Sequence, residues 1–238
     1  SNTSGRQVCV ECLKSRENPP YLRLMWRIGW HCHCDRHRVC LIDHCTECGA
    51  TIQPFKADLE HDCLAICTIC GFDLRNFEGS KNINLNALNF QNKADQVLNQ
   101  KVGFYNQSRV TSQAWFEIAR AWLSEIRFLV NTSNKNVIQL FESFDVNLHL
   151  AYPITPLAFE YLNKQERIVL LSILDQIMEI PCDLLVERSL EYGISHANFW
   201  DKRKKLPVQL QQMKDLMLKP TRRYPVSRAA ITVTKPKS

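Results

Sequence analysis

The chain has 238 residues, 45% of them hydrophobic, which is enough to bury a sizeable core in one or two domains. It contains no run of about 18 apolar residues, and residues 1–20 lack the basic and then apolar pattern of a signal peptide. Composition therefore gives no support for membrane insertion or secretion, and its eleven cysteines, if most of them bind metal, fit a reducing cytosol.

The net charge of +6 is unevenly distributed along the chain. Residues 1–76 carry nine basic and nine acidic side chains, and residues 77–215 carry fifteen of each. The whole excess lies in residues 216–238, which hold six Lys or Arg and no acid. The first segment thus has no obvious net field for phosphate, and a protein-facing role for it is favoured at least as much as a DNA-facing one.

Four pairs of metal-binding side chains lie between residues 9 and 70. The pairs, each separated by two residues, are Cys9 with Cys12, Cys34 with His37, Cys45 with Cys48, and Cys67 with Cys70. Two ligands at this spacing on a tight turn can face one ion, and four thiolate or imidazole ligands complete tetrahedral Zn²⁺. Gly49 and Gly71 directly follow two pairs, where a knuckle needs a positive φ. The pattern predicts two Zn²⁺ ions per chain rather than buried free thiols, a disulfide framework or an iron–sulfur cluster.

The spacing leaves two ways to group the four pairs. We expect sequential grouping, in which the first two pairs share one ion and the last two share the other, while an interleaved cross-brace stays open. Because protein ligands fill all four positions in either case, no position is left for a catalytic water. The ions are therefore expected to be structural.

Seven further cysteines and histidines in this region lack a partner at the same spacing. They are Cys32, Cys40, Cys63, His31, His33, His44 and His61. For the cysteines we expect small thiols that are buried or half-buried, and for the histidines we expect surface positions.

Residues 21–30 combine seven large apolar side chains with Arg23 and Arg27. This alternation predicts a strand or hairpin arm that covers a metal site. We expect Trp26 and Trp30 to shield that site rather than to stack on nucleic-acid bases. Some apolar groups of the stretch are expected to pack on the later helices, and others to remain exposed as an interface patch.

Residues 77–84 are rich in Gly, Ser and Asn, which predicts a linker. We expect a double zinc-ribbon module over residues 1–78 before it. An α-helical domain over residues 79–218 follows, in which apolar side chains recur at intervals of three and four. The expected helices cover residues 85–102, 112–130 and 137–144, a segment starting at Thr155 and Pro156, a segment from the capping box Asn163–Glu166 to just before Pro181, and residues 208–218.

Residues 183–205 predict a helix-turn-helix, with short helices over 183–192 and 195–205 that are broken at Gly193. The second helix exposes side chains suited to phosphate and base-edge contacts, namely His196, Asn198, Lys202, Arg203, Lys204 and Lys205. Nearby acids largely cancel this charge, and such units also serve as structural corners, so DNA contact here is one of two open alternatives.

The basic tail over residues 219–238, which includes Arg222 and Arg223, is expected to be an extended arm that binds phosphate non-specifically, or a connection to further protein. The sequence shows no glycine-rich phosphate loop, nucleophile elbow or nuclease-like carboxylate set, and His149 and Cys182 are isolated. We therefore expect a protein that is not an enzyme.

Several segments resemble the TniQ family, which includes TnsD, the target selectors of Tn7-like transposons. The resemblance rests on residues 9–13 (CVECL), 21–27 (YLRLMWR), 34–37 (CDRH) with Leu41, and 45–49 (CTECG), and continues more weakly through residues 193–195 and 206–207. It covers about residues 9–218. The family normally carries a helical segment before its first cysteine pair, whereas eight residues precede Cys9 here and the chain does not begin with Met, so we expect a fragment.

The resemblance implies a non-enzymatic adaptor in the bacterial cytoplasm, associated with the nucleoid. It would link a DNA target, bound directly or through an RNA-guided effector complex, to an AAA+ transposition ATPase of the TnsC type, and a homodimer is left open. The alternative is a zinc-stabilised, sequence-specific DNA-binding transcription regulator. In either case we expect a mainly α fold with a small zinc-ribbon β module.

Overall fold

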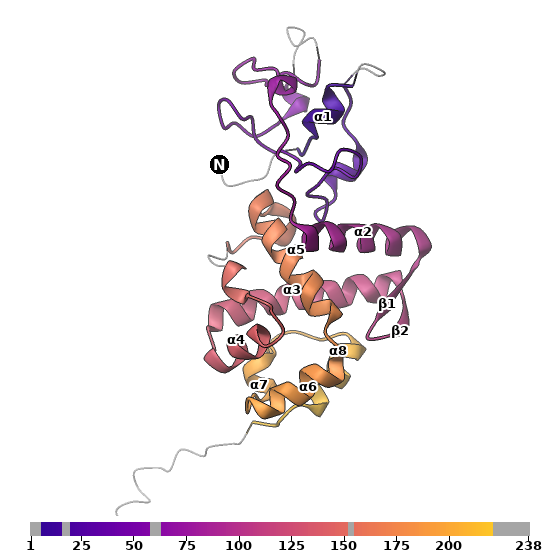
Figure 1. Ribbon diagram of the computed structural model, residues 1–238, viewed down its shortest axis with the longest axis vertical. Helices are drawn as coiled ribbons and strands as arrows, with labels where there is room; N and C mark the ends of the chain where they lie inside the picture. The colour runs from indigo at the N-terminus through magenta and orange to yellow at the C-terminus, as the bar shows by residue number, and fades with distance from the viewer. Residues whose placement is uncertain (1–5, 16–19, 58–62, 152–154, 221–238) are drawn as a thin grey trace, which may run out of the picture.

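The computed structural model describes residues 6–15, 20–57, 63–151 and 155–220. These residues form a mainly helical, elongated molecule, in which the cysteine-rich segment makes one end and the helices make the rest (Figure 1). We refer to residues 6–80 as the cysteine-rich module and to residues 81–220 as the helical body. Among the described residues, no helix is long and apolar enough to cross a membrane.

The described residues of the cysteine-rich module form short helical turns between loops. They are α1 (Val10–Leu13) and the 3₁₀ turns η1 (Leu24–Arg27), η2 (Pro54–Lys56) and η3 (Leu74–Asn76). The strand predicted within residues 21–30 is wrong, because a strand would place residues 24 and 26 on the same face. Instead the chain turns at η1, which buries Trp26 and leaves Leu24 75% exposed.

Ribbon strands are likewise not formed in the described part of this module. Its backbone pairs through isolated antiparallel bridges, which are Val8–Ile42, His33–Cys40, His44–Thr51 and Ile66–Asp73. A small apolar core, which includes Leu13, Leu41 and Leu74, lies between the loops. A core of this size is too small to hold a compact domain by itself, so the module depends on its ligand clusters and on its contact with the helices.

The helical body begins after the linker predicted near residues 77–84. Its elements are α2 (Leu85–Gln100), β1 (Val102–Tyr105), β2 (Ser108–Thr111), α3 (Ser112–Thr132), α4 (Lys135–Glu142), η4 (Leu148–Ala151), η5 (Phe159–Tyr161), α5 (Lys164–Glu179), α6 (Cys182–Glu191), α7 (His196–Phe199) and α8 (Val208–Leu216). Helices α2, α3 and α4 lie within two residues of the ranges predicted from periodicity. The N-cap bond of the predicted capping box is present at α5, since Asn163 Oδ1 accepts from the Glu166 N–H at 2.9 Å. The Glu166 carboxylate accepts from the Asn163 side-chain amide at 2.8 Å instead of from the Asn163 backbone N–H.

A β-hairpin between α2 and α3 was not predicted. β1 and β2 pair antiparallel in the register Val102 to Thr111 and Tyr105 to Ser108. The two residues of the turn, Asn106 and Gln107, both have positive φ, at 46° and 61°, as a two-residue hairpin turn requires. Gln is an unusual residue for such a turn, which explains why the sequence pattern gave no signal.

The helix predicted to start at Thr155 is also wrong. Arg127 of α3 donates to the backbone carbonyls of Thr155 and Leu157, and the Thr155 N–H donates to the Glu166 carboxylate. Arg127 thus occupies carbonyls that would accept the first hydrogen bonds of a helix, and only the short turn η5 forms before α5.

The largest core lies where α2, α3 and α5 pack together and continues toward the C-terminal helices. Phe199 and Trp200 are fully buried there, and the rings of Trp122 and Trp200 lie 5.2 Å apart. α7 has only four residues and ends at Phe199, since the backbone is extended at Trp200. The second helix predicted over residues 195–205 is therefore too long, and the helix-turn-helix remains a prediction.

Candidate metal centres

The first two ligand pairs come together beside α1. The ligand atoms of Cys9, Cys12, Cys34 and His37 all lie within 4.8 Å of one another. Cys12 Sγ lies 3.7 Å from Cys34 Sγ, and His37 Nδ1 lies 3.3 to 3.7 Å from the three sulfur atoms.

The last two pairs form a second cluster. The ligand atoms of Cys45, Cys48, Cys67 and Cys70 also lie within 4.8 Å of one another. The Sγ distances are 3.8 Å from Cys45 to Cys70 and 3.8 Å from Cys48 to Cys67. The clusters therefore follow the sequential grouping and not the interleaved one.

These distances match the edges of a tetrahedron around a metal ion. With metal–sulfur bonds of about 2.3 Å, the sulfur–sulfur edge is about 3.8 Å, and with a metal–nitrogen bond of about 2.0–2.1 Å, the sulfur–nitrogen edge is about 3.6 Å. Both clusters have four ligands at about these separations. The residues present thus fit two four-coordinate metal ions, one with Cys₃His and one with Cys₄ ligands.

Three of the ligand pairs are held by the same backbone turn. Gly49 and Gly71, with φ of 69° and 73°, donate their N–H groups to the carbonyls of Cys45 and Cys67 at 2.9 Å. Arg38 takes the corresponding place after His37, with φ of 49°, and its N–H donates to the Cys34 carbonyl at 2.9 Å. Sequence inspection missed this third turn because its left-handed residue is not glycine.

Within each cluster the thiol pKa values shift in both directions, raised at Cys9 and Cys70 and lowered at Cys34 and Cys67 toward the thiolate, the form that binds metal. The pKa of the Cys34 thiol is about 5, because Cys9 hydrogen-bonds to its sulfur and the backbone N–H groups of His37 and Arg36 point toward it. Burial raises the pKa of Cys67, but the backbone N–H groups of Cys70 and Ile69 outweigh that effect and bring it to about 7.

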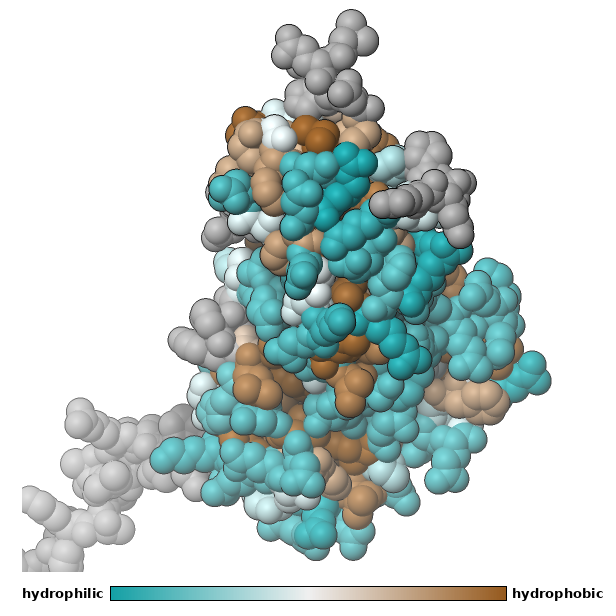
Figure 2. Space-filling view, turned by 45° about the horizontal axis from the view of Figure 1, so that its top comes forward, coloured by the Kyte–Doolittle hydropathy of each residue, from teal (hydrophilic) through white to brown (hydrophobic). Residues whose placement is uncertain are grey.

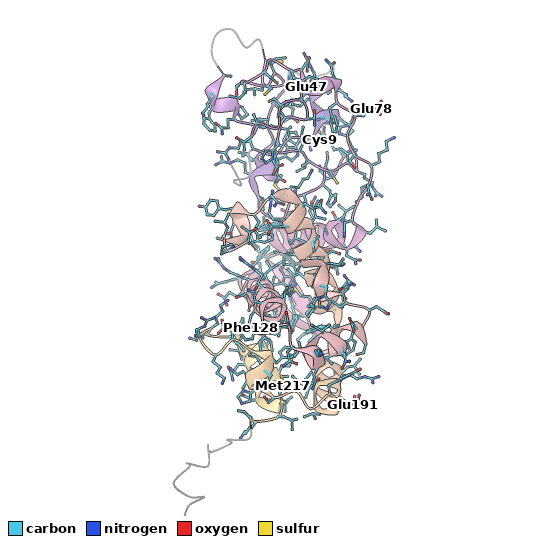
Figure 3. The ribbon with its side chains drawn as sticks, turned by 90° about the vertical axis from the view of Figure 1, so that its left-hand side faces the viewer. Cys9, Glu47, Glu78, Phe128, Glu191 and Met217 are labelled. Atoms are coloured by element: carbon cyan, nitrogen blue, oxygen red, sulfur yellow. The ribbon has the colours of Figure 1, made fainter. Side chains whose placement is uncertain are left out.

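The two clusters differ in their distance from the helical body. Glu47 directly precedes Cys48 of the second cluster. In Figure 3, Cys9 of the first cluster lies between the helical body and Glu47, which lies near the end of the molecule that the cysteine-rich module forms. Cys9 and Cys34 are fully buried, whereas Cys48 and Cys70 are exposed. The first cluster is thus the inner one and the second is the outer one.

A buried glutamine joins the inner cluster to the helices. Gln91 of α2 is fully buried, and its Oε1 accepts from the backbone N–H groups of Cys32 and His33 at 3.1 and 3.2 Å. Its Nε2 donates to the His33 carbonyl at 3.1 Å. Since Cys34 follows directly, the position of this metal ligand is coupled to α2.

Two more polar contacts support the same junction. Asp95 of α2 accepts from Trp30 Nε1 at 3.0 Å and lies 2.8 Å from His31 Nε2. Arg167 of α5 donates to the Gly29 carbonyl at 2.9 Å. Trp30 therefore does not shield a metal site, because its ring stacks on Phe116 of α3 at 5.0 Å, whereas Trp26 does lie in the core of the cysteine-rich module.

The surface positions predicted for the histidines are wrong for His31 and His33, which are 4% and 0% exposed. Both lie in the junction, and burial lowers the pKa of His33 to about 4. His44 is half-buried against Asp43, and His61 lies outside the described residues. Of the isolated thiols, Cys32 and Cys40 are buried in the core of the helical body and Cys63 is half-buried, as predicted.

The residues proposed for nucleic-acid contact do not share one helix. His196 and Asn198 lie on α7, whereas Lys202, Arg203, Lys204 and Lys205 follow it in a non-helical turn. Arg203 Nε is paired with the buried Asp201 at 3.0 Å, and Lys204 contacts Ser124 of α3. Arg222 and Arg223 lie outside the described residues.

A residue that sequence reasoning missed holds this basic turn in place. Glu125 of α3 is 1% exposed, and its carboxylate accepts from the Asp201 N–H at 3.1 and 3.3 Å. Burial raises the pKa of Glu125 to about 8. Glu125 lies three residues after Trp122 and seven after Ile118, at the edge of the apolar face of α3, but sequence reasoning gave it no role.

Comparison of the chain with family models, with curated proteins and with solved structures gives no match. The likeness to the TniQ family therefore rests on the ligand pairs and on the residues between them.

Proposed function

We propose that the two clusters hold Zn²⁺ as structural ions. Cysteine with histidine in a closed tetrahedral set is typical of zinc, and in such sites metal binding supplies much of the folding free energy. The module has a small core, so its folding would depend on the ions. Elemental analysis of the purified protein tests this proposal. Two zinc ions per chain support it, and iron with visible absorbance, or fewer than two ions, refutes it.

We further propose that the protein is a non-enzymatic target-selection adaptor that links DNA, directly or through an RNA-guided effector complex, to an AAA+ transposition ATPase of the TnsC type. One observation carries this proposal: the two closed clusters enclose the segments that resemble TniQ proteins and stand together at one end of a helical body. A rigid module with no ligand position left for substrate suits a docking role.

DNA binding by the whole, zinc-loaded protein is the first test. Gel shifts with random DNA and then with attachment-site DNA separate an adaptor that binds its target directly from a protein without DNA affinity. If the basic turn after α7 contacts bases, exchange of Lys202 and Arg203 for Ala changes the preference of the protein among DNA sequences. If the two side chains contact only phosphates, the exchange weakens binding to all sequences equally. A helix-turn-helix role for α6 and α7 requires the changed sequence preference.

The ATPase contact is assigned to the exposed surface of the cysteine-rich module. There Leu24, Phe55 and Ile69 are 75%, 72% and 66% exposed, and Figure 2 shows hydrophobic residues at the surface of this end. Phe55 lies toward the helical body, since it lines a pocket together with Glu160 and Arg167. Large apolar side chains that are exposed and form a contiguous patch mark protein interfaces. Trp30 and Cys32 pack into the helical body, so the module is best tested within the whole chain.

Pull-down of the ATPase by surface variants tests that assignment. Leu24→Ser and Phe55→Ser are expected to weaken ATPase capture without loss of zinc. The matched control is Leu216→Ser on α8 of the helical body, which is 68% exposed and lies at the other end of the molecule. Loss of capture in the control alone would move the partner surface to the helical body.

A further inference from the structure

A pocket of about 290 Å³ lies where the cysteine-rich module meets the helical body. Arg6 and Arg27 line it from the module, and Arg167 lines it from α5. Glu160 is the only acid among its described lining residues. The volume is close to the lower limit of the roughly 300–1,000 Å³ range of ligand pockets, so the pocket suits a small polar group.

Within the described ranges of the chain, Arg167 is a buried cation that has no carboxylate partner. It is 2% exposed, and its Nη1 donates to the Gly29 carbonyl, whereas its Nε has no hydrogen-bond partner among the described residues. Over the same part of the chain, no carboxylate oxygen lies within 4.0 Å of Arg6, Arg27 or Arg167. Fully buried arginines are normally paired, because burying an unpaired charge costs several kcal/mol.

A second buried side chain on the pocket wall has an unsatisfied atom. Gln7 is 6% exposed, and its Nε2 donates to the carbonyls of Trp26 and His31 at 2.9 and 2.8 Å. Its Oε1 has no partner in the part of the chain that the structure describes. The residues that line the pocket thus include two buried side chains with an unpaired polar atom, a donor on Arg167 and an acceptor on Gln7, and both atoms lie below the surface that a water molecule can reach.

We propose that this pocket binds a phosphate group. Phosphate oxygens accept charge-assisted hydrogen bonds from guanidinium groups, and three arginines meet here. Inorganic phosphate, a terminal phosphate and a phosphodiester all present such oxygens. The source is therefore free inorganic phosphate or a phosphate of a nucleic acid, and the chemistry at the arginines is the same.

Titration of the whole, zinc-loaded protein with inorganic phosphate tests the pocket directly. Chloride at equal ionic strength is the reference, and calorimetry and the shift in Tm are the readouts. Arg27→Gln, at an exposed position, is expected to weaken phosphate binding about tenfold through loss of one charge-assisted contact. Glu160→Gln is expected to tighten it, because a like charge is removed. Arg109→Gln, on the exposed face of β2, is the matched control and leaves it unchanged.

A second arm identifies the source of the phosphate. If a nucleic acid supplies it, a 5′-phosphorylated oligonucleotide displaces inorganic phosphate, and Arg27→Gln lowers the salt slope of DNA binding by about one. If the source is free phosphate, the oligonucleotide does not compete. Both results support phosphate binding in the pocket.

The proposal is refuted if wild-type protein shows no phosphate-dependent heat or rise in Tm, or if Arg27→Gln and Glu160→Gln bind phosphate as the wild type does. Both substitutions are at exposed positions, so circular dichroism is expected to show an unchanged fold. The phosphate arm needs neither DNA nor an ATPase, and its outcome is independent of the adaptor function proposed above.

Discussion

Gln91→Ala is expected to weaken the junction between the cysteine-rich module and the helical body. The substitution removes three hydrogen bonds at 3.1, 3.2 and 3.1 Å and leaves two backbone N–H groups and one carbonyl without partners. Each unpaired buried group costs about 1–3 kcal/mol. Because the space left by the side chain admits water, the lower end applies, and we expect a loss of about 3–4 kcal/mol in the free energy of unfolding. The free energy of unfolding of a typical domain is only about 5–15 kcal/mol.

Urea unfolding in the presence of zinc measures this loss. Gln96→Ala is the matched control, since Gln96 is the same residue type on the same helix but is exposed, and it should change the stability by no more than about 0.5 kcal/mol. Amide exchange at Cys32 and His33 is expected to accelerate in Gln91→Ala, because both N–H groups lose their acceptor.

The same variant also tests whether α2 positions a metal ligand. Cys34 directly follows the segment that Gln91 holds, so transfer of metal to a chelator should become faster for the inner cluster and stay unchanged for the outer one. A stability loss below about 1 kcal/mol, or equal acceleration at both clusters, would refute the reasoning.

Three further perturbations have defined outcomes. Cys67→Ser should remove one ion by elemental analysis and leave the far-UV circular dichroism of the helices mostly intact, whereas Cys34→Ser, beside the junction, should also lower the Tm of the helical body. Burial raises the pKa of Glu125 from 4.5 to about 8, so the folded state holds the extra proton and stability falls as the pH rises through this range. Glu125→Gln should abolish that slope, at most about 1.4 kcal/mol per pH unit, in urea unfolding between pH 5 and 8. Deletion of residues 219–238 should weaken DNA binding for all sequences and flatten its salt dependence, and an unchanged slope would mean that the tail makes no phosphate contacts.

The ligand clusters could be predicted from the sequence because their geometry is local. Two ligands separated by two residues lie on one turn, and a glycine after the pair marks that turn, as Gly49 and Gly71 do. The pairing of distant turns is not local, yet the sequential grouping follows when each pair closes with its nearest neighbour. The equivalent turn at Arg38 shows the limit of the pattern, since its left-handed φ has no glycine to reveal it.

The environment of individual polar residues could not be predicted in the same way. His31 and His33 were assigned to the surface, but the two structural parts meet over them and bury both. Glu125 lies at the edge of the apolar face of α3, and its burial is completed by the turn after α7, which folds over it. In each case the deciding contact is with a residue at least 58 positions away in the chain, beyond the reach of any window over the sequence.

Charge shows most clearly how folding changes what a segment count suggests. Residues 1–76 carry equal numbers of acids and bases, and on that count the cysteine-rich module has no phosphate-binding field. Folding nevertheless brings Arg6 and Arg27 from the module against Arg167 from α5, with Glu160 as the only acid among the described lining residues. A net charge measures the field far from the molecule, where opposite signs cancel, whereas a ligand responds to the few charges within about a Debye length of 8–10 Å. A segment with no net charge can therefore still contribute to a local cluster of positive charge, and the phosphate titration tests whether this cluster binds an anion.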